Sequence, residues 1–191
     1  MDKESVRRFC EEYNIPLISK ETEDFLIQQI YLYKPASLAE IGSAIWYSTT
    51  IIANTVSSYN KYGRVDSREI SYPHYWQALL TIEKYASNTT IYLGNVCHIA
   101  REKYTTQHYD MVFIDGRKSE TLLYLKKLRH HIHENTLIIV DDVIKFKNKM
   151  TDRYEFLDKY DIKYQIHQLE NDDGIITLAV TQLLIQALSS L

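Results

Sequence analysis

From about residue 36 onward, short apolar runs of strand length alternate with segments that have a helical pattern. The expected strands are 37–41, 64–70, 90–93, 111–115, 137–141, 163–169 and 175–180. Several runs are continuously apolar rather than alternating, which is typical of parallel strands covered by helices on both faces. The helix-compatible segments between them are 47–60, 74–86, 97–104, 119–133 and 151–160. This rhythm predicts a three-layer α/β domain with a doubly wound, mostly parallel sheet of seven strands.

The two ends of the chain fit one domain, which we expect to span residues 1–191. Residues 1–35 precede the first strand as a helical segment, in which Ser19 can cap a helix that opens with acidic residues. Residues 172–174 read Asp-Asp-Gly and form a tight turn, so the last strand should run antiparallel to its neighbour. The apolar tail 181–191 is helix-compatible, and it either covers the sheet or meets another subunit in a homodimer.

Composition argues against several classes of protein. The hydrophobic fraction of 45% and the charged fraction of 25% are ordinary for a globular domain. The formal net charge of −3 gives no overall attraction to nucleic acid or an anionic membrane. No run approaches the ~18–20 apolar residues of a membrane span, and the charged N-terminus is unlike a signal peptide. Since Cys10 and Cys97 lack metal-type spacing, a reduced, cytoplasmic protein is the simplest expectation.

The turn after the first strand is the first candidate for a binding site. Residues 39–48 read Ala-Glu-Ile-Gly-Ser-Ala-Ile-Trp-Tyr-Ser and connect a buried strand to a helix. At the carboxyl edge of a parallel sheet, such a turn lets a ligand approach the backbone and the helix N-terminus. Gly42 and Ser43 lie in this turn, between Glu40 and Ser48. A lone glycine is also compatible with an ordinary strand-to-helix turn.

The wider stretch 18–48 resembles the approach to the cofactor site of class I S-adenosylmethionine-dependent methyltransferases, specifically the catechol and caffeoyl-CoA O-methyltransferases. Their pattern is an acidic residue, an apolar residue, glycine, three variable residues, glycine, an aromatic residue and serine. Glu40, Gly42, Tyr47 and Ser48 match it, whereas Trp46 replaces the second glycine. The indole of Trp46 could point away from the cofactor, stack on it or block it.

Two further strand ends extend this resemblance along the sheet edge. Glu69 ends the second strand, where a carboxylate can accept hydrogen bonds from both ribose hydroxyls of a nucleoside; alternatively it is a solvated strand-end charge. Asn95 follows Leu93-Gly94 and matches the position where the family usually has an aspartate facing the adenine. The implied contacts to S-adenosylmethionine are Glu40, Gly42, Ser43, Ser48, Glu69, Asn95 and Asp115.

Three aspartates follow two expected neighbouring strands. One strand ends in Asp115, with Lys118 three residues later, and the next ends in Asp141-Asp142. Adjacent parallel strands deliver their carboxyl ends to one edge, so the three carboxylates should converge and raise one another's pKa. A hard divalent cation such as Mg²⁺, Mn²⁺ or Ca²⁺ would remove that cost. The competing interpretation is that these aspartates occur there only because the carboxyl edge of a parallel sheet is exposed to solvent.

The resemblance assigns roles within this cluster. It implies Asp115 and Asp141 as metal ligands, with Asp142 in the place of the family's asparagine as a third ligand. Lys118 matches the family's lysine near the reacting hydroxyl, as general base or electrostatic guide, so Lys118 and Asp115 are the catalytic candidates. A lysine can act as a base only if its surroundings depress its pKa.

The function implied is a methyltransferase that uses S-adenosylmethionine and a divalent cation to methylate a hydroxyl of a small molecule. One alternative acceptor is a protein or a modified base of RNA, which would meet the basic run Lys145, Lys147, Lys149 and Arg153 beside the acidic cluster. The other alternative is a non-catalytic binding module in which Trp46 fills the cofactor site. A second basic run, 129–133, falls at the end of the helix expected over 119–133 and is interpreted as a solvated cap.

Overall fold

The computed structural model describes residues 3–13, 15–96, 108–169 and 174–191. Seven strands form one sheet in the order β3-β2-β1-β4-β5-β7-β6. Their bounds are β1 Ser37–Ile41, β2 Arg64–Glu69, β3 Thr89–Leu93, β4 Tyr109–Ile114, β5 Ile132–Val140, β6 Gln165–Gln168 and β7 Gly174–Ala179. Neighbouring strands from β3 to β5 pair in parallel, whereas β7 runs antiparallel to both β5 and β6. The predicted α/β fold with an antiparallel last strand is confirmed.

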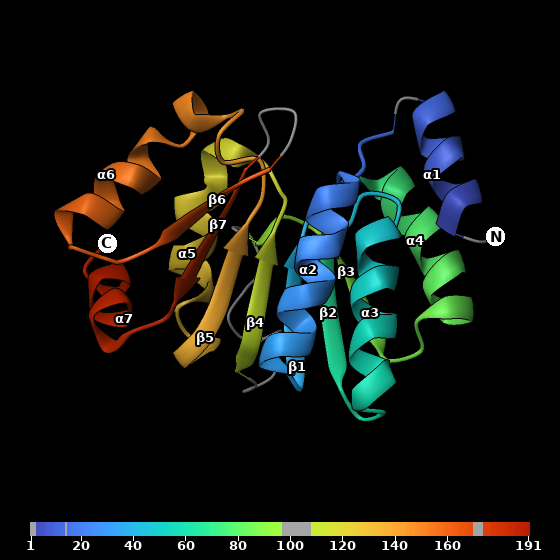
Figure 1. Cartoon of the computed structure of the whole chain (residues 1–191), viewed down its shortest axis with the longest axis horizontal. Coiled ribbons are helices and arrows are strands. Elements are labelled where there is room, and N and C mark those ends of the chain that lie inside the picture. The colour runs from blue at the N-terminus through green and yellow to red at the C-terminus, as the bar shows by residue number, and fades with distance from the viewer. Residues whose placement is uncertain (1–2, 14, 97–107, 170–173) are drawn as a thin grey trace.

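Helices cover both faces of this sheet (Figure 1). They are α1 Lys3–Glu12, α2 Lys20–Tyr33, α3 Tyr47–Tyr59, α4 Tyr72–Tyr85, α5 Thr121–Leu128, α6 Thr151–Lys159 and α7 Gln182–Ser189. The parallel strands β1 to β5 all end at the same edge of the sheet. The arrowheads of β4 and β5 mark this edge in Figure 1. None of the described helices is long and apolar enough to cross a membrane.

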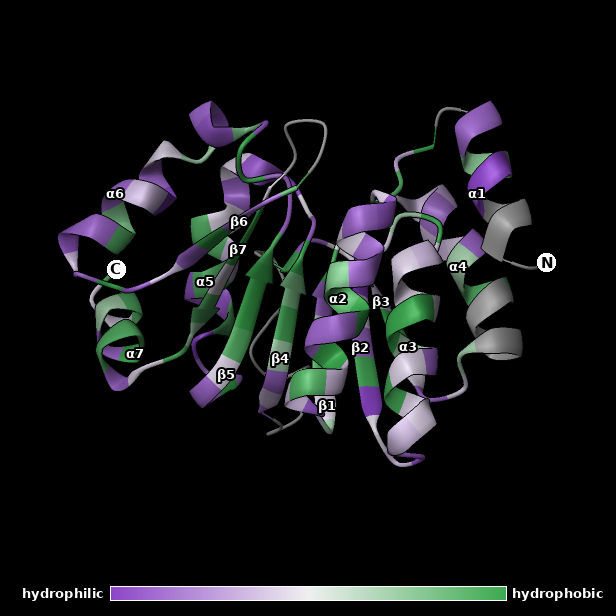
Figure 2. Ribbon diagram, in the orientation of Figure 1, coloured by the Kyte–Doolittle hydropathy of each residue, from purple (hydrophilic) through white to green (hydrophobic). Residues whose placement is uncertain are grey.

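The central strands consist mainly of hydrophobic residues, and Figure 2 shows this most clearly along β4 and β5, which are mostly green. In β4, Met111 and Phe113 belong to a buried cluster with residues of α2 and α3. Val112 and Ile114 belong to a second cluster with residues of α5, α6 and α7. Because side chains alternate across a strand, these two clusters are the two layers of core on either side of the sheet.

The helix expected over residues 119–133 is shorter than predicted, which is a correction. A 3-10 turn over Lys118–Glu120 precedes α5, and α5 ends at Leu128. Residues from Ile132 onward already belong to β5, where Ile132 pairs with Tyr109 of β4. Strand pairing therefore overrides the helical pattern at this end. His131, interpreted as part of a solvated helix cap, is only 8% exposed.

The two terminal segments are packed onto the sheet. The side chain of Ser19 accepts a hydrogen bond from the backbone N–H of Thr22, so Ser19 caps α2 as predicted. At the other end, Leu184 and Leu188 of α7 are fully buried in the second cluster, so the apolar tail covers the sheet. The helix expected at 97–104, with Cys97, and the aspartates of the turn at 172–174 lie outside the described residues.

Candidate active site

A cavity of about 660 Å³ opens at the carboxyl edge of the parallel strands. The turn after β1, the ends of β2, β4 and β5, and the N-terminal segment line it. A smaller cavity of about 60 Å³ adjoins it toward β3 and shares Gly42, Glu69, Ile70 and Gly116 with it. This edge is where open α/β sheets bind their ligands.

The turn after β1 packs directly on the end of β4. Gly42 has a φ of +95°, and a Cβ at this position would lie 2.6 Å from the backbone oxygen of Asp115. The backbone N–H groups of Gly42 and Ser43 both donate to the carbonyl of Arg68, at 2.9 and 3.3 Å. Only glycine combines this conformation with such a close approach. Glycine is therefore required at position 42, where the turn after β1 packs against the ends of β2 and β4.

Trp46 occupies the position where the resembled family has a second glycine. Its φ is +87°, a left-handed backbone conformation that residues other than glycine rarely adopt. The half-buried indole packs against the apolar cluster beneath α3, and Trp46 lines neither cavity. Of the three predicted orientations, the structure therefore has the one that points away, and it leaves the larger cavity open.

Glu40 lies behind the turn rather than on a cavity wall. Its carboxylate is fully buried and accepts hydrogen bonds from the hydroxyls of Thr49 on α3 and Ser67 on β2, both at 2.5 Å. Burial raises the pKa of Glu40 to about 7. Glu40 thus supports the turn from below, and direct contact with a cofactor stays a prediction. Ser43 and Ser48 do line the cavity, and their predicted contact with a cofactor stays a prediction.

The ends of β2 and β3 place Glu69 and Asn95 along the same edge. The carboxylate of Glu69 accepts a 2.6 Å hydrogen bond from the backbone N–H of Ser71, and Glu69 lines both cavities. Asn95 lines the smaller cavity and donates to Glu120 at 3.0 Å. Tyr124 also donates to Glu120, at 2.9 Å. Glu120 and Tyr124 were not predicted from the sequence, because neither belongs to a strand end.

The structure brings the predicted acidic cluster together around Lys118. The Lys118 Nζ lies 2.6 Å from Asp115 Oδ1 and 3.1 Å from Asp142 Oδ2. Asp141 is 4% exposed and accepts a 3.3 Å hydrogen bond from the hydroxyl of Thr22 on α2. All three aspartates and Lys118 line the large cavity.

The charges of this cluster are strongly coupled. Burial raises the pKa of Asp141, and the nearby carboxylate of Asp115 raises it further. Burial alone would lower the pKa of Lys118, but Asp115 and Asp142 outweigh it and raise that pKa above its ordinary value. Lys118 is therefore a cation here. Both of its predicted roles, general base and electrostatic guide, stay predictions.

The donor set suits a hard divalent cation, although the ligands are not yet gathered around one point. Three carboxyl groups lie around one ammonium, and every candidate donor atom is an oxygen. Within the described ranges, no three acidic, histidine or cysteine side chains are arranged to hold a metal ion. A divalent cation would therefore have to displace the ammonium of Lys118 from between Asp115 and Asp142.

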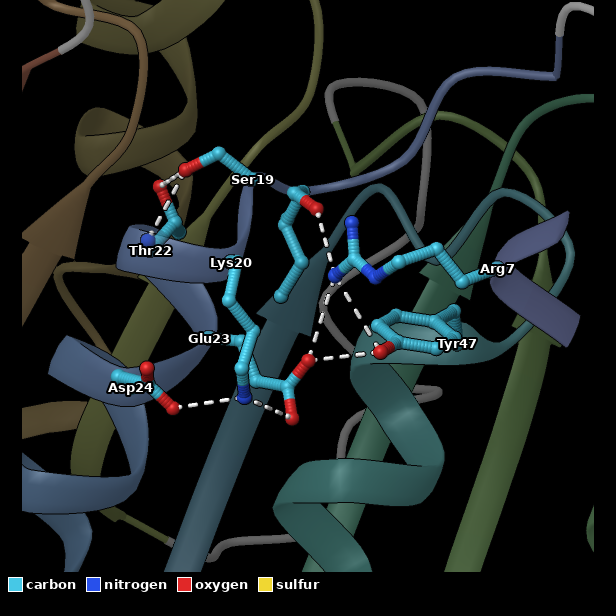
Figure 3. A network of polar contacts seen from close by, with 8 residues as sticks. Arg7, Ser19, Lys20, Thr22, Glu23, Asp24 and Tyr47 are labelled. Atoms are coloured by element: carbon cyan, nitrogen blue, oxygen red, sulfur yellow. Dashed lines mark hydrogen bonds and ion pairs between the residues drawn. The ribbon is translucent and has the colours of Figure 1, made fainter. Parts of the chain in front are cut away.

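Several cavity residues were not among the predicted site residues, although Tyr47 matched the family pattern. Arg7 of α1 and Tyr47 of α3 line the cavity, and both are bonded to the buried Glu23 of α2 (Figure 3). His74 and Phe146 also line it. These residues are brought together only by the packing of distant elements, which local patterns do not report.

The basic run beside the site divides in two. Lys145 lines the cavity, and Lys147 and Lys149 are exposed next to it. Arg153, expected to be solvated with them, is completely buried and stacks on Tyr154 with its guanidinium carbon 4.2 Å from the ring centroid. The run is therefore shorter than the sequence suggested. An RNA contact through the three lysines stays a prediction.

A family model described as a methyltransferase domain matches residues 39–143, which is more than half of the chain. The chain belongs to this family. The match runs from β1 to just beyond β5, so it includes the turn at Gly42, Glu69, Asn95 and all three aspartates. The protein is thus a class I S-adenosylmethionine-dependent methyltransferase, as the resemblance implied.

Solved structures of other methyltransferases share the fold of this one. An O-methyltransferase of Bacillus cereus, solved with S-adenosylhomocysteine, is 23% identical with a TM-score of 0.80, covering 94% of this chain and 90% of its own. The O-methyltransferase TomG of Streptomyces achromogenes, involved in tomaymycin synthesis and solved with S-adenosylmethionine, is 17% identical with a TM-score of 0.78, covering 94% and 89%. A candidate caffeoyl-CoA O-methyltransferase of Staphylococcus aureus is 22% identical with a TM-score of 0.77, covering 94% and 93%.

Proposed function

We propose that this methyltransferase transfers a methyl group from S-adenosylmethionine to a hydroxyl oxygen of a small molecule, with a divalent cation assisting. The convergence of Asp115, Asp141, Asp142 and Lys118 on one wall of the large cavity is the observation that carries the proposal. The O-methyltransferases that share the fold are consistent with an oxygen acceptor. The acceptor and the cation would share the acidic wall of the cavity.

The donor is assigned to the neighbouring part of the same edge. Glu69 lines both cavities with a carboxylate already oriented by the N–H of Ser71, which suits the ribose hydroxyls. Asn95 on the smaller cavity suits the adenine, and the turn around Gly42 suits the remaining methionine part. When bound, the donor supplies an activated methyl group on sulfur, and the cation supplies Lewis acidity beside the acceptor hydroxyl.

The protein's own residues contribute orientation and charge. Asp115, Asp141 and Asp142 would hold the cation, and Lys118, once released from Asp115 and Asp142, would place a positive charge beside the acceptor oxygen. Fixing donor and acceptor in one cavity converts a bimolecular reaction into an effectively unimolecular one.

The test is a methyl-transfer assay with isotope-labelled donor, a panel of catechol-like hydroxyl compounds, and Mg²⁺, Mn²⁺, Ca²⁺ or a chelator. We expect divalent-dependent labelling, and a loss of about a hundredfold or more in Asp115→Asn and Asp141→Asn. Asp158→Asn, on the exposed surface of α6, is the matched control and should retain activity. Labelling that persists in chelator would refute the metal, and labelling of nitrogen alone would refute the oxygen acceptor.

A further inference from the structure

Arg7 of α1 makes the contacts that connect the N-terminal segment to the rest of the cavity (Figure 3). Its Nη2 atom lies 3.3 Å from each of three oxygens, which belong to the carbonyl of Ile18, the carboxylate of Glu23 and the hydroxyl of Tyr47. The guanidinium carbon also lies 5.0 Å from the centroid of the Tyr47 ring, a cation–π contact. One side chain therefore connects α1, the segment before α2, α2 itself and α3.

The partners of Arg7 are buried and bonded to each other. The side chain of Glu23 is 2% exposed, and it accepts a 2.6 Å hydrogen bond from the hydroxyl of Tyr47. Its other oxygen lies 3.3 Å from the Nζ of Lys20, whose own side chain is 59% exposed. A buried carboxylate is costly without a nearby cation. Arg7, at 19% exposure, is the more shielded of these two cations.

Tyr47 connects this network to the donor part of the cavity. It is the first residue of α3, directly after the turn that contains Gly42 and Trp46, and it is 6% exposed. It lines the large cavity together with Ser43 and Ser48 of the same turn. Any displacement of the Tyr47 ring would therefore change the wall against which the donor is assigned.

The N-terminal segment forms another part of the cavity wall. Residues 15–19 line the cavity, as do Arg7 and Glu11 of α1. Cys10 and Ile18 anchor the segment in the apolar cluster beneath α3. The larger cavity is thus enclosed partly by this segment, which is hydrogen-bonded to α2 through Ser19 and to α1 through the Arg7 side chain.

We propose that Arg7 is a positioning residue, which holds residues 15–19 and the Tyr47 ring in place as two walls of the cavity, so that donor binding and docking of the N-terminal segment reinforce each other. The proposal rests on the donor placement given above. A donor that contacts both walls binds only when both are in place, and by thermodynamic reciprocity its binding must tighten the attachment of the segment. Removing the Arg7 contacts should then weaken donor binding, although Arg7 needs no contact with the reacting atoms.

The test is calorimetry of the full-length protein with S-adenosylhomocysteine, combined with hydrogen exchange of residues 15–19. In the wild type we expect binding and ligand-dependent protection of this segment. Arg7→Met should weaken the affinity about tenfold and abolish that protection. Arg8→Met, on the exposed side of the same helix, is the matched control and should behave as the wild type. Arg7→Lys, which keeps the charge, should recover part of the affinity.

A second variant and a thermal measurement separate positioning from mere stability. If Arg7→Met fails to fold, the double variant Arg7→Met with Glu23→Gln removes the uncompensated charge and should show the same loss of affinity. Suppose that Arg7→Met lowers the melting temperature, but S-adenosylhomocysteine raises the melting temperature of Arg7→Met as much as that of Arg8→Met. This result would overturn the inference and leave the proposed function intact. A wild type that binds no S-adenosylhomocysteine at millimolar concentration would overturn both.

Discussion

At the scale of single residues, two positions next to the cavity support its structure in unusual ways. One has a left-handed backbone conformation, and the other has a buried carboxyl group. Gly42 has a positive φ, and a Cβ added there would collide with the end of β4. Gly94 also has a positive φ, of +127°, but a Cβ added there would meet no atom of the described residues within 4 Å. Glu40 keeps a carboxylate fully buried between α3 and β2. Gly42 and Glu40 therefore both support the turn that faces the donor site.

Gly42→Ala should destabilise the protein more than Gly94→Ala. Both variants place a side chain in a left-handed conformation, at a cost of about 1–2 kcal/mol. Only Gly42→Ala also drives a Cβ to 2.6 Å from the backbone oxygen of Asp115, which adds about 1–3 kcal/mol of overpacking. Urea unfolding of the two variants measures the difference. Equal losses would mean that the contact with Asp115 relaxes without cost.

Glu40→Gln should flatten the dependence of stability on pH. Burial raises the pKa of Glu40 from 4.5 to about 7, so the folded state holds this proton more tightly than the unfolded state. Its stabilising contribution is complete below pH 4.5 and is lost as pH rises through about 7, with a total of about 3 kcal/mol. The free energy of unfolding of wild type and variant, measured from pH 5 to 8, gives the difference. Parallel curves would contradict this assignment.

At the scale of elements, the site depends on where helices and strands end. α2 begins at Lys20 behind the cap Ser19, and its first turn delivers Thr22 to Asp141 and Glu23 to Arg7 and Tyr47. The 3-10 turn Lys118–Glu120 before α5 delivers Lys118 to the aspartates. A shift of either helix start by one residue would rotate these side chains by about 100° away from the cavity.

At the scale of the whole molecule, the sheet divides the hydrophobic core into two layers. Different helices cover each layer. α2 and α3 cover one face near the donor site, and α5, α6 and α7 contribute to the cluster on the other. The C-terminal helix therefore contributes to stability although it lies outside the matched methyltransferase segment 39–143.

Leu188→Ala should test this contribution of α7. Leu188 is fully buried, and its truncation should cost about 2–5 kcal/mol. Leu183, on the same helix, is 47% exposed, so Leu183→Ala should change stability by less than about 0.5 kcal/mol. Denaturant midpoints of both variants provide the measurement. If Leu183→Ala were the more damaging, its exposed side would be an interface with another subunit.

The sequence by itself determined the alternation of strands and helices along the chain and the residues at the strand ends. Continuous apolar runs separated by helical patterns specify a parallel α/β sheet, and its topology forces Gly42, Glu69, Asp115 and Asp141 to one edge. The helical pattern over 119–133 was misleading at its end because pairing of Ile132 with Tyr109 overrides local propensity.

Only the tertiary structure decided what depends on contacts between distant residues. The orientation of Trp46 follows from the apolar cluster beneath α3, and the burial of Arg153 follows from packing around α6. The charge of Lys118 depends on carboxylates from two strand ends, and the meeting of Arg7, Glu23 and Tyr47 depends on three helices. Local periodicity reports which face of an element is apolar, but not which side chain of another element it meets.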